Sequence, residues 1–125
     1  MTDAMGFRQE LTISTQVTDL DKALTWYQDM LGCELIYRVD DLGWAEVASP
    51  VNGVAIGLSQ VDKPKTAGPV PVWGVDDIDA ARRILESKDV RFDGDTITIP
   101  DMVRLATFFD PDGNAWMLAQ TLAKG

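Results

Sequence analysis

The sequence reads TDLDKA at residues 18–23 and DDIDAA at residues 76–81, and these two stretches are the strongest indication of how the chain folds. Each places an aspartate directly before an apolar position of a helical repeat, a pattern that is typical of a capped helix start. Each also follows a strand-like run of residues. Two strand-to-helix junctions with the same residue types indicate an internal duplication.

The first half of the chain reads as a strand, a helix and three further strands. Residues 11–17 alternate apolar and polar side chains with β-branched enrichment, and apolar positions recur at helical spacing over residues 20–31. Gly32 is a typical residue to end that helix, and Asn52-Gly53 is a strong tight-turn signal. The further strand-like runs cover residues 34–39, 43–48 and 54–59.

The second half repeats this order. A helix is expected from Ile78 to a point before Val90, and the polar stretch from Asp110 to Asn114 predicts a turn. Pro71 lacks a backbone donor, which confines its strand to an edge or makes it a strand start. The strand-like runs cover residues 70–75, 96–99, 103–109 and 115–121.

This order predicts an α+β fold with two tandem βαβββ modules. At 125 residues, the chain has the size of one compact domain. We expect a single domain over residues 1–125, with module one at about residues 8–60, a proline- and glycine-bearing connector at residues 61–69, and module two at about residues 70–122.

The charge balance excludes two classes of partner. Eleven Lys and Arg against 20 Asp and Glu give a net charge of -9, which repels phosphate backbones and anionic lipid headgroups. No apolar run is long enough to span a bilayer. We therefore expect neither nucleic acid nor a membrane as a partner. The single cysteine, Cys33, excludes an intrachain disulfide and fits a reducing, cytoplasmic location.

The absence of histidine removes whole reaction classes. Without imidazole the chain cannot build a Ser-His-Asp or Cys-His site, a zinc site of the HExxH kind, or an iron site with two histidines and a carboxylate. With one cysteine besides, only oxygen-ligand sites for Mg²⁺, Mn²⁺ or Ca²⁺ remain.

The order of the motifs resembles that of the vicinal oxygen chelate superfamily, which includes glyoxalases, bleomycin-resistance proteins and extradiol dioxygenases. The resemblance spans nearly the whole chain and implies curled mixed sheets around a cavity, in a protein that is usually a homodimer. It is carried by VTDLDKA at 17–23, WY at 26–27, LGCEL at 31–35, VDDIDAA at 75–81 and FFDPDGN at 108–114.

Metalloenzymes of that superfamily place one ligand on the first strand and one on the last strand of each module. Carried onto this chain, the four positions fall at Thr12, Gly57, Val70 and Met117. None is a histidine or a carboxylate. A shift of the alignment by one residue in either direction also brings no histidine or carboxylate to these positions. We therefore expect no metal and no other cofactor, as in the metal-free branch that sequesters drugs or other small molecules.

Strand alternation predicts the residues that line the cavity. Small and hydroxyl side chains leave room in the cavity. Trp44 could stack on a planar ligand, and Glu46 could bind a cationic ligand or form an ion pair with Arg104. Plain packing for Trp44 and a solvated carboxylate for Glu46 stay open as alternatives. The predicted ligand-binding residues are Thr12, Ser14, Trp44, Glu46, Gly57, Ser59, Val70, Met102, Arg104 and Met117.

Three functions fit these observations. The first is a metal-independent homodimeric protein that binds a neutral or cationic, partly aromatic small molecule, such as an antibiotic or another natural product. The second is a metal-free lyase or isomerase in which Glu46 is the catalytic acid or base and Arg104 stabilises the negative charge that develops on the substrate. The third is a scaffold subunit that has lost activity and acts through its dimer surface.

Overall fold

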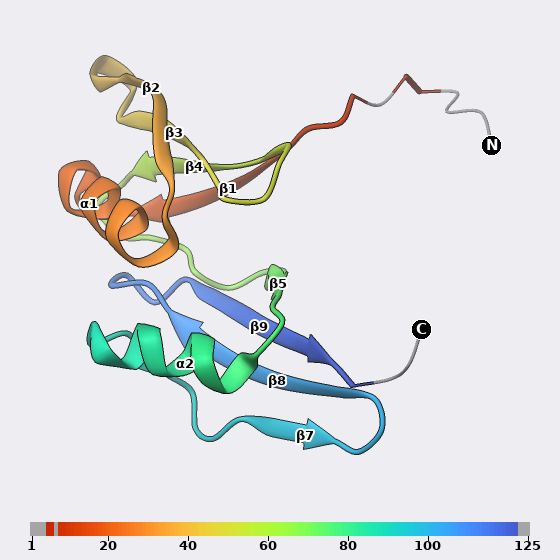
Figure 1. Ribbon diagram of the computed structural model, residues 1–125. Helices are drawn as coiled ribbons and strands as arrows, with labels where there is room; N and C mark the ends of the chain where they lie inside the picture. The colour runs from red at the N-terminus through yellow and green to blue at the C-terminus, as the bar shows by residue number, and fades with distance from the viewer. Residues whose placement is uncertain (1–4, 7, 123–125) are drawn as a thin grey trace. The chain divides into compact units, whose positions relative to one another are not determined.

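The computed structural model describes residues 5–6 and 8–122, which fall into two compact units divided between Lys65 and Thr66. Each unit combines an α-helix with a β-sheet, as can be followed in Figure 1. The first unit contains β1 (Leu11–Val17), α1 (Leu20–Leu31), β2 (Glu34–Val39), a 3₁₀ turn (Asp40–Leu42), β3 (Trp44–Ala48) and β4 (Val54–Gln60). The second contains β5 (Val72–Gly74), α2 (Ile78–Ser87), β6 (Arg91–Phe92), β7 (Ile97–Ile99), β8 (Val103–Phe109) and β9 (Ala115–Thr121).

The first unit is a mixed four-stranded sheet in the order β1-β4-β3-β2, with α1 against one face. β1 runs parallel to β4, while the other neighbours are antiparallel. Asp19 caps α1 as predicted, because its Oδ1 accepts a hydrogen bond of 3.0 Å from the backbone N–H of Lys22. Gly32 ends the helix with a φ of 73°, in the left-handed region that glycine tolerates.

The core of the first unit lies between α1 and the sheet. Apolar side chains from one face of the helix pack against every second side chain of the strands. Burial therefore follows the helical period of 3.6 residues along α1 and the period of two residues along the strands. The side chains with no exposed surface are Val17, Tyr27, Ala45, Val47, Ile56 and Leu58. Among the described residues of this unit, no helix covers the opposite face of the sheet.

The second unit repeats this plan. β5 runs parallel to β9, β9 pairs with β8, and β8 pairs with β6 and β7. Asp77 caps α2 through a 3.1 Å hydrogen bond from the backbone N–H of Ala80. β5 is shorter than predicted and begins after Pro71, which has no N–H to donate, and the two-residue β6 was not predicted. The predicted α+β class with a duplicated strand and helix order is confirmed.

Trp116 is buried on the α2 side of the second sheet. Trp73 stacks on it with ring centroids 5.7 Å apart. The predicted turn before β9 is built on Asp110, whose carboxylate accepts hydrogen bonds from the backbone N–H groups of Asp112 and Asn114 and from the Asn114 side chain. In residues 5–6 and 8–122, neither helix is long and apolar enough to cross a membrane.

Candidate functional site

The face of the first sheet that points away from α1 carries the candidate site. On β3, Ala45 and Val47 are buried on the helix side, while Trp44, Glu46 and Ala48 alternate with them and are half-buried. Because successive side chains point to opposite faces of a strand, these three lie on the open face.

The strand registers align this face in rows. One row contains Ser14 of β1, Gly57 of β4, Glu46 of β3 and Tyr37 of β2. The next row contains Thr12, Ala55 and Ala48, and the row on the other side contains Gln16, Ser59, Trp44 and Val39. The six predicted ligand-binding residues of this half therefore share one face, as the alternation indicated.

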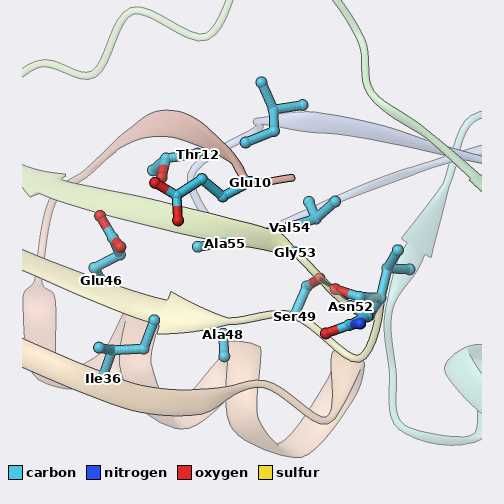
Figure 2. Close-up of a pocket in the computed structure, with 12 residues that line it drawn as sticks. Glu10, Thr12, Ile36, Glu46, Ala48, Ser49, Asn52, Gly53, Val54 and Ala55 are labelled. Atoms are coloured by element: carbon cyan, nitrogen blue, oxygen red, sulfur yellow. Dashed lines mark hydrogen bonds between the residues drawn. The ribbon is translucent and has the colours of Figure 1, made fainter. Parts of the chain in front are cut away.

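A pocket of about 520 Å³ opens on this face at the end where β1 begins. Its volume is in the range of sites that enclose small molecules. Figure 2 shows Thr12 and Ala55 on neighbouring strands of its floor, Glu46 on β3, and Glu10 from the segment before β1. Of the predicted residues, Thr12 and Glu46 line the pocket, whereas Ser14, Trp44, Gly57 and Ser59 continue the same face beyond it.

The pocket is acidic with apolar walls. Among the described residues that line it, the charged ones are Glu10 and Glu46, and Ile36 and Val54 supply apolar surface. Glu10 lies 3.3 Å from Nε of Arg8, in an exposed ion pair that solvent screens strongly. Two carboxylates beside apolar surface suit a ligand that is neutral or positively charged.

The tight turn predicted at Asn52-Gly53 closes one end of the pocket. Gly53 has a φ of 82°, and a Cβ at this position would lie 2.5 Å from the backbone oxygen of Gln9. The backbone N–H of Leu11 donates a 2.7 Å hydrogen bond to the Gly53 oxygen. Only glycine satisfies both the conformation and the close approach, so this end of the pocket depends on Gly53.

Trp44 has two neighbours on the open face. Its Nε1 donates a 3.0 Å hydrogen bond to the hydroxyl oxygen of Tyr37 on β2. The outer edge of its six-membered ring lies against Gly57 on β4. Its indole therefore spans β3 from one neighbouring strand to the other.

The other four predicted binding residues belong to the second unit. Met117 lies on β9 between Trp116 and Leu118, which are buried on the helix side, so that Met117 faces the open side of the second sheet. Val70 precedes β5 and Met102 lies in the turn before β8, and both are exposed.

Arg104 is engaged within the second unit. Its guanidinium donates to both carboxylate oxygens of Asp79 on α2, at 2.8 and 3.1 Å, and to the hydroxyl of Thr98. Arg104 shares its strand face with Ala106, which is buried on the helix side. In the structure, Arg104 therefore pairs with Asp79, and the predicted alternative was a pair with Glu46. The hydrogen bonds from Arg104 hold the pKa of the Asp79 carboxyl below its ordinary value.

The residues at the four superfamily metal positions are poor metal donors. Thr12 offers a hydroxyl, Gly57 and Val70 offer no side-chain donor, and Met117 offers only a thioether. Within the described part of the chain, no three His, Cys, Asp or Glu side chains gather as a metal site would require. Cys33 is buried, and this burial raises the pKa of its thiol to about 11, which keeps it protonated.

Several pocket residues were missed by sequence reasoning. Glu10 precedes the first predicted strand, and Ser49 and Asn52 lie in a turn to which alternation does not apply. Ile36 lies at an irregularity in the pairing of β2 with β3, between Leu35 and Tyr37. A bulge of this kind changes which side chains face the pocket, and no sequence signal marked it.

The comparisons with known proteins agree with this architecture. Residues 11–118 match the family model described as the Glyoxalase/Bleomycin resistance protein/Dioxygenase superfamily. None of the curated proteins compared with the chain matches it.

Three solved structures illustrate the likeness. A superfamily member from Sphaerobacter thermophilus has 26% identity and a TM-score of 0.78, over 91% of this chain and 98% of that one. TnmS3, an antibiotic-binding protein from Streptomyces sp. CB03234, has 29% identity and a TM-score of 0.73, over 94% and 98%. A glyoxalase/bleomycin resistance protein from the same organism has 30% identity and a TM-score of 0.66, over 89% and 99%.

Proposed function

Since the chain belongs to the Glyoxalase/Bleomycin resistance protein/Dioxygenase superfamily, we propose that it binds a small molecule in the pocket of the first sheet without a metal ion. The observation that carries this proposal is the pocket itself, which has about 520 Å³ of space beside the small and hydroxyl side chains of Thr12, Ala48 and Ala55. The likeness to an antibiotic-binding protein supports an antibiotic or another natural product as the ligand.

The lining supports a neutral or cationic ligand that is partly aromatic. Glu10 and Glu46 would repel an anion and attract an amine, and the net charge of -9 acts in the same direction at longer range. Trp44 and Tyr37 offer aromatic surface next to Glu46. Binding therefore combines apolar contact with one charge-assisted hydrogen bond.

The donor types at the superfamily metal positions support metal independence. A hydroxyl at Thr12 and a thioether at Met117 do not replace the imidazoles and carboxylates that hold a catalytic metal ion. The ligand would instead be held by protein groups alone, and the role of the protein would be capture rather than turnover.

Calorimetric titration with candidate antibiotics, with and without EDTA, tests this proposal. We expect the same affinity in both conditions and an affinity for cationic ligands about tenfold lower in the Glu46→Gln variant, because one charge-assisted hydrogen bond is lost. Glu34→Gln, at an exposed glutamate of β2, is the matched control and should change little. Binding that appears only after a divalent metal is added would overturn the proposal.

We also propose that the protein is a cytoplasmic homodimer. β2 is an edge strand, and all six of its residues are exposed, among them Leu35, Ile36 and Val39. An exposed apolar edge needs a cover, and a second copy of the chain can supply one. Light scattering after size exclusion should give twice the mass of 13.7 kDa, and a monomer at micromolar concentration would contradict it.

A further inference from the structure

The indole of Trp44 occupies the space that a side chain at position 57 would need. A Cβ added to Gly57 would overlap Cη2 of Trp44 and would lie 2.7 Å from Cζ2 and 3.0 Å from Cζ3. No residue other than glycine fits here while the indole keeps its place. The backbone of Gly57 has an ordinary conformation, so the close approach of Trp44 accounts for the glycine.

The other end of the indole is held by a hydrogen bond. Nε1 of Trp44 donates to the hydroxyl oxygen of Tyr37 at 3.0 Å. One contact lies on β4 and the other on β2, and the side chain that they hold comes from β3 between them. Two contacts on opposite sides restrict the rotamers of the indole before any ligand arrives, which lowers the entropy lost on binding.

The two contacts flank the pocket carboxylate. In the strand registers Gly57 pairs with Glu46, and Glu46 pairs with Tyr37, so the three stand in one row across the sheet. The indole of Trp44 contacts both neighbours of Glu46 in that row, Gly57 and Tyr37. An aromatic ring that stacks on Trp44 would therefore place an attached amine near Glu46.

We propose that Gly57 and Tyr37 are positioning residues that hold Trp44 as a fixed stacking surface beside Glu46. The pocket and this adjoining surface would then together select planar aromatic amines over saturated amines of the same charge. The inference rests on the proposed function, because it assigns the ligand class of the same pocket. Stacking contributes beyond the area that it buries, and the corresponding gain in affinity is about two- to tenfold.

Two amines of matched charge test this selectivity by calorimetry. 9-Aminoacridine is planar and aromatic, 1-aminoadamantane is compact and saturated, and both are cations at neutral pH. We expect the wild-type protein to prefer the acridine, and Trp44→Leu to bring the ratio of the two affinities close to one. Gly57→Ala should do the same by displacing the indole, and Tyr37→Phe should lower the ratio in part.

Two control variants separate stacking from charge and from general effects. Glu46→Gln should weaken both amines alike and leave their ratio unchanged. Trp26→Phe, on α1, should leave both affinities unchanged. The acridine should quench the tryptophan fluorescence of Trp44→Leu less than that of the wild-type protein. In Trp26→Phe, where Trp44 is still present, the acridine should still quench the fluorescence of Trp44. If Gly57→Ala does not fold, Tyr37→Phe and Trp44→Leu still give the comparison.

The outcomes separate this inference from the function on which it rests. A wild-type protein that binds both amines, with a ratio that Trp44→Leu leaves unchanged, would overturn the stacking surface and keep the pocket. A protein that binds neither amine would contradict the cationic small-molecule pocket and the stacking surface together.

Discussion

Gln60 and Gln120 make the same hydrogen bond in the two units. Oε1 of Gln60 accepts from the backbone N–H of Leu20, and Oε1 of Gln120 accepts from the backbone N–H of Ile78, each at 2.8 Å. Both donors are the first residues of their helices, whose N–H groups have no partner within the helix. The shared bond supports an internal duplication beyond the similarity of the two sequence stretches.

Removing either glutamine should destabilise its unit by a similar amount. We expect Gln60→Ala and Gln120→Ala each to cost about 1–2 kcal/mol, because a part-buried N–H loses its acceptor. Urea unfolding measures the change. Gln28→Ala, at an exposed position of α1, is the control and should change stability little. Equal effects at all three positions would show that the helix-start bonds do not matter.

Asp110 should be the most sensitive residue of the turn before β9. Its buried carboxylate accepts three hydrogen bonds, so Asp110→Ala should lower the free energy of unfolding by about 3 kcal/mol. Asp110→Asn keeps one acceptor oxygen and should lose less. Thermal unfolding of the two variants gives the ranking, and a fully stable alanine variant would contradict the role assigned to the turn.

Cys33 should be unreactive in the native protein. Burial raises the pKa of its thiol from 9.0 to about 11, so that the thiolate fraction at neutral pH falls about a hundredfold. Labelling with a chromogenic disulfide should therefore be slow in buffer and complete in urea. Rapid labelling in buffer would show that the thiol is not held in the core.

The ion pair between Arg104 and Asp79 should make stability depend on acid pH. Hydrogen bonds from Arg104 hold the pKa of the Asp79 carboxyl below its ordinary value. The stabilisation is therefore present above the ordinary pKa of an aspartate and is lost as the pH falls through the lowered one.

The Asp79→Asn variant tests this dependence. It should be less stable than the wild-type protein at neutral pH, and the difference in melting temperature should shrink in acid. Asp95→Asn, at an exposed aspartate of the second unit, is the comparison variant. A difference that stays constant over the acid range would exclude the ion pair as its cause.

Alternation along single strands was the most successful guide to the site. It placed Thr12, Ser14, Gly57 and Glu46 on one face, because side chains of a strand alternate regardless of what the strand pairs with. The same reasoning grouped Arg104 with its neighbours on β8 but could not say which face meets α2. That choice depends on packing, and the structure places Arg104 beside Asp79.

The capped helices, the duplicated order of elements and the absence of histidine could be read from the amino-acid sequence, because they depend on local chemistry and on composition. The folded chain alone decided where the pocket opens, that Glu10 and Ile36 line it, and that Trp44 rests on Gly57. These features join segments distant in the chain or depend on a bulge, and local patterns carry no information about such pairings.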